Sequence, residues 1–257
     1  MLTGATGGIG KLLAAQLSRQ GATLVLSCYQ QEALEDLNHE LGNKHVLACA
    51  DIDSHQGQHA IVETCQQAKG IDAVINLAGI LDFAVFENQP IQIIEKTLSI
   101  NLLAPMLLCH ALIPILKDRA EAVILNVGSI FGSIGHPGFV AYCTSKAGVK
   151  CFTEALSREL ADTNIRVAYI APRATRTNLN DDRINSLNAA LGNKTDSPEF
   201  VANEIVRLFL SDRQTSYLGW PENLFVKINA IFPRLVRRSL VKNLQLIKQF
   251  VTTGETL

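Results

Sequence analysis

The chain has 257 residues and a formal net charge of −1, and 47% of its residues are hydrophobic. This length suits one α/β domain with a single core, and the near-neutral charge excludes a general affinity for nucleic acid. The cysteines lack C-x-x-C spacing, and we find no signal peptide and no uncharged apolar stretch of roughly 18 residues; together these features predict a cytoplasmic protein with free thiols, no metal site and no membrane span.

The chain opens with a glycine-rich turn, followed by a segment whose apolar residues fall at helical spacing. The turn reads Thr3-Gly4-Ala5-Thr6-Gly7-Gly8-Ile9-Gly10. Glycines let main-chain N–H groups approach a ligand closely, and the helix start that follows can hold a phosphate. Such a turn needs a strand before it, and only Met1 and Leu2 are present. We therefore expect that the natural protein starts several residues upstream or that this numbering omits them; otherwise the fold would be weakened.

Apolar runs of strand length alternate with helical stripes through the middle of the chain. Strands are predicted at 22–27, 45–50, 71–75, 122–127 and 165–170, and helices around 33–41, 61–62 and 141–160. The segment 90–116 is predicted to be largely helical, with Pro105 as a kink or a helix start. The alternation predicts an α/β fold: a doubly wound parallel sheet of the Rossmann type, with helices on both faces.

A serine follows one of these buried runs, in Asn126-Val127-Gly128-Ser129, thirteen positions before Tyr142. A polar residue at this point lies on the rim where ligands bind in open α/β sheets. Tyr142 and Lys146 are four residues apart on a predicted helix, so they share one face. A cation within about 4–6 Å favours a phenolate and lowers its pKa. The pair therefore indicates a tyrosine tuned for proton transfer.

Together these residues resemble the short-chain dehydrogenase/reductase family in its single-domain branch, with a match that runs from Thr3 to about Thr177. The resemblance implies a catalytic set made of Asn101, Ser129, Tyr142 and Lys146. It also implies contacts with a dinucleotide cofactor from Gly4, Thr6, Gly8, Ile9, Gly10, Asp51, Ile52, Asn76, Ala78, Gly79, Tyr142, Lys146, Pro172 and Thr177.

Two positions depart from the family pattern. Leu77 replaces the second asparagine of an Asn-Asn-Ala-Gly motif, and Arg173 replaces the glycine of a Pro-Gly pair after Pro172. The second change puts an arginine near the pyrophosphate or nicotinamide end of the cofactor.

The reaction that the resemblance implies is hydride transfer between a nicotinamide and a small or lipophilic carbonyl or alcohol substrate. Tyr142 would carry the proton, Lys146 would lower its pKa, Ser129 would hold the substrate oxygen, and Asn101 would hold a water. The alternative is a catalytically silent dinucleotide-binding protein with a regulatory or scaffold role. Nucleotide-sugar epimerases also use a YxxxK pair, but usually with a longer chain and a different glycine loop.

Cofactor and substrate preference are weakly encoded. The stretch Ser27-Cys28-Tyr29-Gln30-Gln31 offers neither a carboxylate for the ribose of NAD nor an arginine for the phosphate of NADP, and the absence of a carboxylate slightly favours NADP. The segment 178–197 lies where the family places a lid over the substrate. Phe83, His136 and Phe139 are candidates to line the pocket.

The C-terminal segment departs from the family, so we divide the chain into a catalytic domain, 1–222, and a basic helical tail, 223–257. Residues 223–253 contain no Asp or Glu and interleave apolar residues with Lys227, Arg234, Arg237, Arg238, Lys242 and Lys248. Subtracting these six charges from the net −1 leaves −7 on the rest. The pattern predicts either peripheral contact of 223–250 with the inner membrane surface or packing on the chain's own domain or a second subunit. We expect a homodimer or homotetramer.

Overall fold

The computed structural model describes residues 1–68 and 70–252. In this part of the chain, seven parallel strands form one sheet in the order β3-β2-β1-β4-β5-β6-β7. Their bounds are β1 Leu2–Thr3, β2 Val25–Cys28, β3 Val46–Cys49, β4 Ala73–Asn76, β5 Ala122–Val127, β6 Ile165–Ala171 and β7 Thr215–Tyr217. The order reverses between β1 and β4, which is where doubly wound sheets bind ligands. The predicted fold is confirmed.

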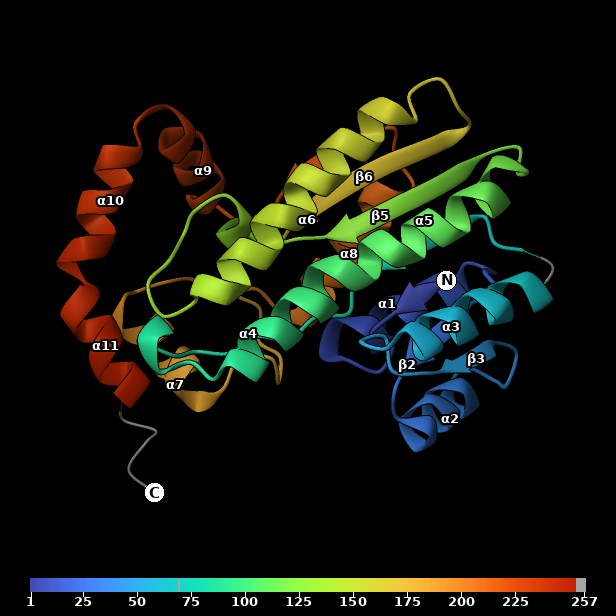
Figure 1. Cartoon of the computed structure of the whole chain (residues 1–257), viewed down its shortest axis with the longest axis horizontal. Coiled ribbons are helices and arrows are strands. Elements are labelled where there is room, and N and C mark those ends of the chain that lie inside the picture. Colours follow the sequence, from blue (N-terminus) through green and yellow to red (C-terminus); the bar gives the residue numbers. More distant parts are fainter. Residues whose placement is uncertain (69, 253–257) are drawn as a thin grey trace.

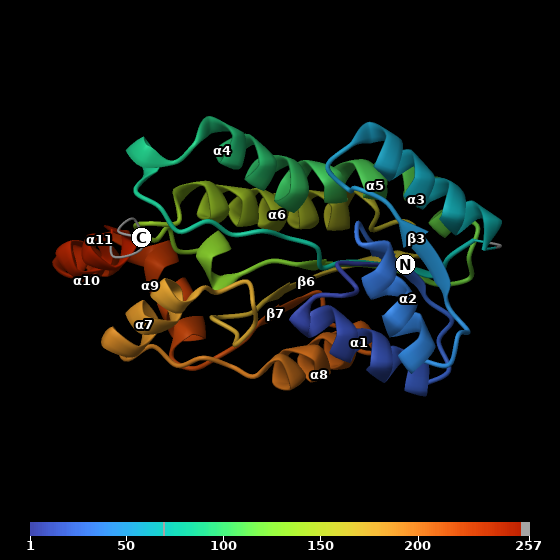
Figure 2. The same cartoon turned by 90° about the horizontal axis from the view of Figure 1, so that it is seen from below.

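Helices cover both faces of the sheet (Figures 1 and 2). One face carries α3 (His55–Gln67), α4 (Ile91–Leu98), α5 (Ala104–Lys117) and α6 (Val140–Glu159), and the other carries α1 (Gly8–Arg19), α2 (Gln31–Glu40) and α8 (Pro198–Phe209). Two apolar cores result, because the strands are buried on both sides. Leu13, Leu34 and Ile205 are fully buried in one core, and Ile61 and Leu112 in the other.

The predicted long helix is divided by a π-helical turn, Ser99–Leu103, between α4 and α5. Pro105 lies in the first turn of α5, where a missing N–H group costs little. By length and composition, the helical stretch Ile91–Lys117 could cross a membrane, so the expectation of no such segment was wrong. One side of this stretch packs in the core, where Leu108, Leu112 and Leu116 are fully buried against neighbouring elements.

The first strand is short but central. Leu2 pairs with Leu26 on one side and with Ile75 on the other. The α-amino group of Met1 donates a hydrogen bond of 2.7 Å to the carbonyl oxygen of Ala73, and burial lowers the pKa of this amino group. The expectation of further residues upstream stays a prediction.

The tail forms α9 (Glu222–Ile231), α10 (Pro233–Lys242) and α11 (Leu244–Thr252). These helices lie together at one end of the molecule, and α10 and α11 project beyond the two layers (Figures 1 and 2). Ile247 and Val251 of α11 are buried against Phe83 and against Ile184 of α7 (Asp182–Ala190). The tail thus packs on its own domain, and the predicted contacts of its outer side with a membrane or second subunit stay predictions.

Candidate active site

The glycine-rich turn is held tightly between β1 and the loop after β4. Gly4 has a φ of +66°, which L side chains rarely adopt, and a Cβ there would lie 2.9 Å from the Cα of Ala78. A Cβ at Gly10 would overlap the carbonyl oxygen of Gly4. Thr3 fixes the other side of the contact, because its hydroxyl accepts hydrogen bonds of 3.1 Å from the N–H groups of Leu77 and Ala78. Only a chain without side chains at Gly4 and Gly10 can form this cradle.

The N-terminus of α1 faces the segment that follows β6. Gly7 is the N-cap of the helix and has no side chain to satisfy the first N–H groups, which leaves them for an anion. A Cβ at Gly8 would lie 3.0 Å from the Cγ2 of Thr177. Ile9 and Thr177 both line the large cavity of the molecule. These features fit the pyrophosphate of a dinucleotide.

The structure places the other predicted cofactor residues in different surroundings. Asp51 is exposed just after β3, where its Oδ1 accepts a hydrogen bond of 3.0 Å from the Asp53 N–H. Ile52, Ala78 and Asn76 line a small cavity behind the loop. Asn76 does not reach the large cavity: it is buried, and its Nδ2 donates a hydrogen bond of 2.8 Å to Asn126 Oδ1. Its visible role is to join the carboxyl ends of β4 and β5.

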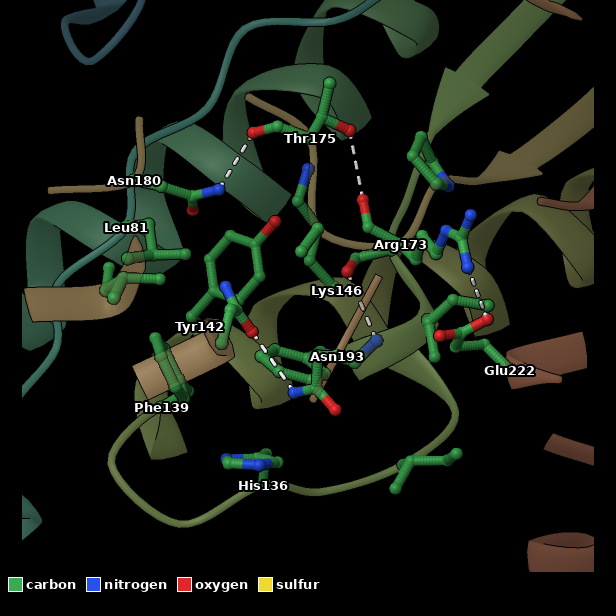
Figure 3. A pocket seen from close by; sticks show the side chains of 18 of the residues that line it. Leu81, His136, Phe139, Tyr142, Lys146, Arg173, Thr175, Asn180, Asn193 and Glu222 are labelled. Carbon is green, nitrogen blue, oxygen red and sulfur yellow. Dashed lines mark hydrogen bonds and ion pairs between the residues drawn. The ribbon is translucent and has the colours of Figure 1, made fainter. Parts of the chain in front are cut away.

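Ser129, Tyr142 and Lys146 come together at one wall of the large cavity. Ser129 follows β5, and its side chain is close enough to the Tyr142 hydroxyl to lower the pKa of that phenol. Tyr142 and Lys146 lie one turn apart on α6, and the Tyr142 hydroxyl and the Lys146 amino group point toward the same part of the pocket (Figure 3). Both side chains are buried. The predicted trio therefore shares one site.

Burial is the largest cause of the pKa shifts of Tyr142 and Lys146. It raises the pKa of Tyr142 to about 12, although the hydrogen bond with Ser129 acts in the opposite direction. Burial also lowers the pKa of Lys146 to about 8. The net shift of Tyr142 is therefore opposite to the one expected from the i, i+4 spacing, because desolvation of the phenolate is its largest cause. A neutral phenol is a ready proton donor.

Asn101 lies behind the trio, inside the π-helical turn. Its Oδ1 accepts a hydrogen bond from the Ile80 N–H, and its Nδ2 donates one to the Ile80 carbonyl oxygen, both at 2.8 Å. The Nδ2 also lies 3.1 Å from Ser145 Oγ. Asn101 lines the small cavity together with Lys146, but it does not line the large one. The turn thus holds Asn101 against the loop after β4 and close to Lys146; π-turns often occur at functional sites.

The large cavity has a volume of about 600 Å³. Apolar residues supply most of its wall, including Leu81, Phe131 and Phe139 from the catalytic side. His136 also lines it, and burial lowers the pKa of this imidazole. Phe83 does not line the cavity but stacks behind Phe139, with ring centres 4.7 Å apart.

The predicted lid and the tail close the cavity. From the lid segment come Leu179, Asn180, Ile184, Leu187, Asn188, Leu191, Asn193 and Lys194, and from the tail Phe225, Ile228, Leu235, Val236, Ser239, Leu240, Asn243 and Ile247. Sequence reasoning missed that the tail is part of the site. The available signal was its apolar residues, which needed a packing partner in addition to the basic ones.

Arg173 joins three separate segments. Its Nη2 lies 2.7 Å from Asp196 Oδ1, at the end of the predicted lid, and its Nη1 lies 2.9 Å from Glu222 Oε2, at the start of α9 and directly before the tail. All three side chains are largely buried, and these partners raise the pKa of Arg173. Figure 3 shows the guanidinium group turned toward Glu222 at the edge of the pocket. Arg173, which stands where the family has a glycine, thus links the segment after β6 to the end of the lid and to the start of α9 through two ion pairs.

The family model described as short chain dehydrogenase matches residues 1–188, which is well over half of the chain. The chain belongs to the short-chain dehydrogenase/reductase family. It is an oxidoreductase with the Rossmann-type fold of a family that uses NAD(P).

Curated relatives of this short-chain dehydrogenase/reductase carry several names. Nodulation protein G of Rhizobium sp. (strain N33) is 33% identical over 74% of this chain and 80% of its own. The 3-ketodihydrosphingosine reductase of Mus musculus is 29% identical over 85% of this chain and 70% of its own. The 3-oxoacyl-[acyl-carrier-protein] reductase of Rickettsia bellii is 28% identical over 85% of this chain and 90% of its own.

Solved structures show the same fold. A short-chain dehydrogenase from Streptomyces avermitilis superimposes with a TM-score of 0.79 and 22% identity, over 95% of each chain. A 3-ketoacyl-(acyl-carrier-protein) reductase from Brucella melitensis complexed with NADH superimposes with a TM-score of 0.75 and 24% identity, over 84% of this chain and 93% of that one.

Proposed function

We propose that the protein transfers a hydride between NAD(P) and the carbonyl or alcohol carbon of a lipophilic substrate. The observation that carries this proposal is the meeting of Ser129, Tyr142 and Lys146 in one cavity, beside the glycine cradle. A bound nicotinamide supplies the hydride. Gly4, Gly8 and the first turn of α1 would hold the pyrophosphate.

The protein's own residues handle the substrate oxygen and its proton. In the direction of reduction, Tyr142 donates the proton of its hydroxyl to the oxygen as charge grows there. Ser129 donates a hydrogen bond to the same oxygen and stabilises that charge. The ammonium group of Lys146, held by the Val127 carbonyl oxygen at 3.0 Å, favours the phenolate that Tyr142 becomes. Asn101 would hold a water that returns a proton through Lys146.

A lipophilic substrate is supported by the lining of the cavity. Leu81, Phe131, Phe139, Leu187 and Ile228 contribute apolar surface, and pockets of several hundred Å³ with a mostly apolar wall suit apolar ligands. Two relatives carry names that describe keto reductases. We therefore favour reduction of a ketone as the reaction to test first.

NADP is the favoured cofactor. Residues 27–31, at the end of β2 and directly after it, include no carboxylate that would repel a 2′-phosphate, and the Thr6 hydroxyl donates a hydrogen bond of 2.9 Å to Cys28 Sγ there. We also propose a homodimer or homotetramer, which sedimentation velocity would test.

A panel of ketones and alcohols, followed by NAD(P)H absorbance with the wild type and the Tyr142→Phe variant, tests the proposed reaction. Turnover that depends on Tyr142 supports the enzyme. Cofactor binding without turnover of any compound would favour the silent regulatory or scaffold protein instead.

A further inference from the structure

The outward side of α10 is basic and apolar at the same time. Arg234, Arg237, Arg238 and Lys242 are spaced to share one side of the helix, and all four are exposed. Within the described residues 1–68 and 70–252, these four side chains make no ion pair. The positive charge of this face is therefore not neutralised by the protein's own acidic domain.

Large apolar side chains flank these charges. Phe232 is 58% exposed, Leu235 56% and Val241 49%. The opposite side of the helix is the packed one, because Val236 and Leu240 contact the cluster that contains Ile130. Exposed apolar side chains of this size, set among arginines, are typical of helices that lie in a membrane interface.

The catalytic cavity opens beside this face. Leu235 of α10 and Phe225 of α9 line the cavity although each is about half exposed to solvent, so both lie at its mouth. The same cavity is lined by Ser129 and by Tyr142, which is buried. In Figures 1 and 2, α10 lies at the extreme end of the molecule, so a flat surface could reach it without meeting the layers of the main domain.

We infer that α10 docks on an anionic phospholipid bilayer and turns the mouth of the catalytic cavity toward the lipid. The substrate is then a membrane-resident lipid with a carbonyl or hydroxyl group, and this part of the inference rests on the proposed function. Charge complementarity carries the assignment, since residues 223–252 include no acidic side chain while the remaining chain is negative.

A second copy of the chain is a less suitable occupant. A two-fold interface would set this face against itself, and the four basic side chains of each copy would then repel those of the other. A bilayer with anionic headgroups matches both the charges and the apolar side chains between them.

Flotation of the full chain with phosphatidylcholine vesicles, with and without phosphatidylglycerol, tests the docking without any measurement of activity. We expect flotation only with the anionic vesicles, weakened by salt. The variant R234Q/R237Q/R238Q/K242Q should bind at least about 100-fold more weakly, since each basic residue near an anionic surface contributes about 1 kcal/mol.

The matched control removes four exposed charges from the main domain, R19Q/K96Q/K117Q/R213Q, and should float like the wild type. Equal flotation of the two quadruple variants would overturn the inference, as would a wild type that stays with the soluble fraction. Sedimentation that shows a dimer lost only in the α10 variant, without vesicle binding, would assign this face to self-association instead.

The orientation of the cavity mouth has its own test. A tryptophan is introduced by Leu235→Trp in a Trp220→Phe background, and brominated phosphatidylcholine is included in the anionic vesicles. We expect strong quenching of that tryptophan and little quenching in a Leu210→Trp control, whose site at the end of α8 is 66% exposed. Equal quenching at the two sites would contradict the orientation. Docking without turnover of any ketone or alcohol would leave the membrane-binding role of α10 in place and refute the proposed reaction.

Discussion

The amino group of Lys146 lies 5.9 Å from the centre of the Tyr142 ring and donates its hydrogen bond to the Val127 carbonyl oxygen. The end of β5 thus holds the lysine in place beside the tyrosine. Both groups are buried, and the cost of desolvation keeps the phenol neutral while it makes the ammonium easier to deprotonate. The charge of Lys146, rather than that of Tyr142, should change in the range of pH where enzymes are usually assayed.

Tyr142→Phe should lower kcat by at least about 100-fold, because it removes the proton donor while the ring keeps its packing. Affinity for the cofactor, measured by fluorescence titration of NADPH, should stay close to that of the wild type. Adding Ser129→Ala to this variant should cost less than the product of the two single effects, since the two hydroxyls act as one unit. A Tyr142→Phe enzyme with normal kcat would remove Tyr142 from the mechanism.

The rate of reduction should fall as the pH rises through about 8. Lys146 loses its charge there, while Tyr142 keeps its proton up to about 12, so the loss of the ammonium group explains the change. The profile of kcat/KM between pH 6 and 10 would be measured in the direction of reduction. Lys146→Met should give a lower and flatter profile; an unchanged inflection in that variant would assign it to another group.

The buried amino group of Lys146 should also make the stability of the protein depend on pH. Burial lowers its pKa to about 8 in the folded protein, against about 10.4 in an unfolded chain. Between these values the unfolded state binds more protons, so the stability of the wild type rises with pH, and below about 8 the full cost of burying the charge is present. The Tm of Lys146→Met relative to the wild type should therefore be highest near pH 7 and decline toward pH 10. Lys150→Met, on the half-buried side of the same helix, is the control.

Arg173→Leu should destabilise the protein by roughly 3–5 kcal/mol in urea unfolding, because it leaves the largely buried carboxylates of Asp196 and Glu222 without their cation. Limited proteolysis should become faster in the segment 178–197. Adding Asp196→Asn should recover part of the lost stability, since it removes one uncompensated charge. Full additivity of the two changes would show that the ion pair does not couple these segments.

Cys28→Asp should shift the preference from NADPH toward NADH by at least about tenfold, or 1.4 kcal/mol. The Sγ of Cys28 lies 2.9 Å from the Thr6 hydroxyl of the glycine turn, so a carboxylate there would repel a 2′-phosphate. Cys28→Asn has nearly the same shape without the charge and should keep the wild-type preference. Dissociation constants for both reduced cofactors with both variants measure this effect.

The sequence alone determined the fold class and picked out Ser129, Tyr142 and Lys146, which meet in one cavity. The strand 122–127 coincides with β5, and the spacing of Tyr142 and Lys146 was enough to place them together, because a helix has a fixed period. The glycine turn could also be predicted from the sequence, since only glycine fits where Gly4 passes Ala78. These features are local, and local geometry follows from a short stretch of residues.

The tertiary structure alone decided what depends on distant segments meeting. Asn76 lies outside the large cavity, and Arg173 forms ion pairs with Asp196 and Glu222. Residues of α9, α10 and α11 form part of the cavity wall. The tertiary structure also reversed the expected shift of Tyr142, because the extent of burial is a property of the whole fold and not of a four-residue spacing. Composition could describe the tail as basic and apolar, but only packing shows which of its residues face the substrate and which remain on the outside.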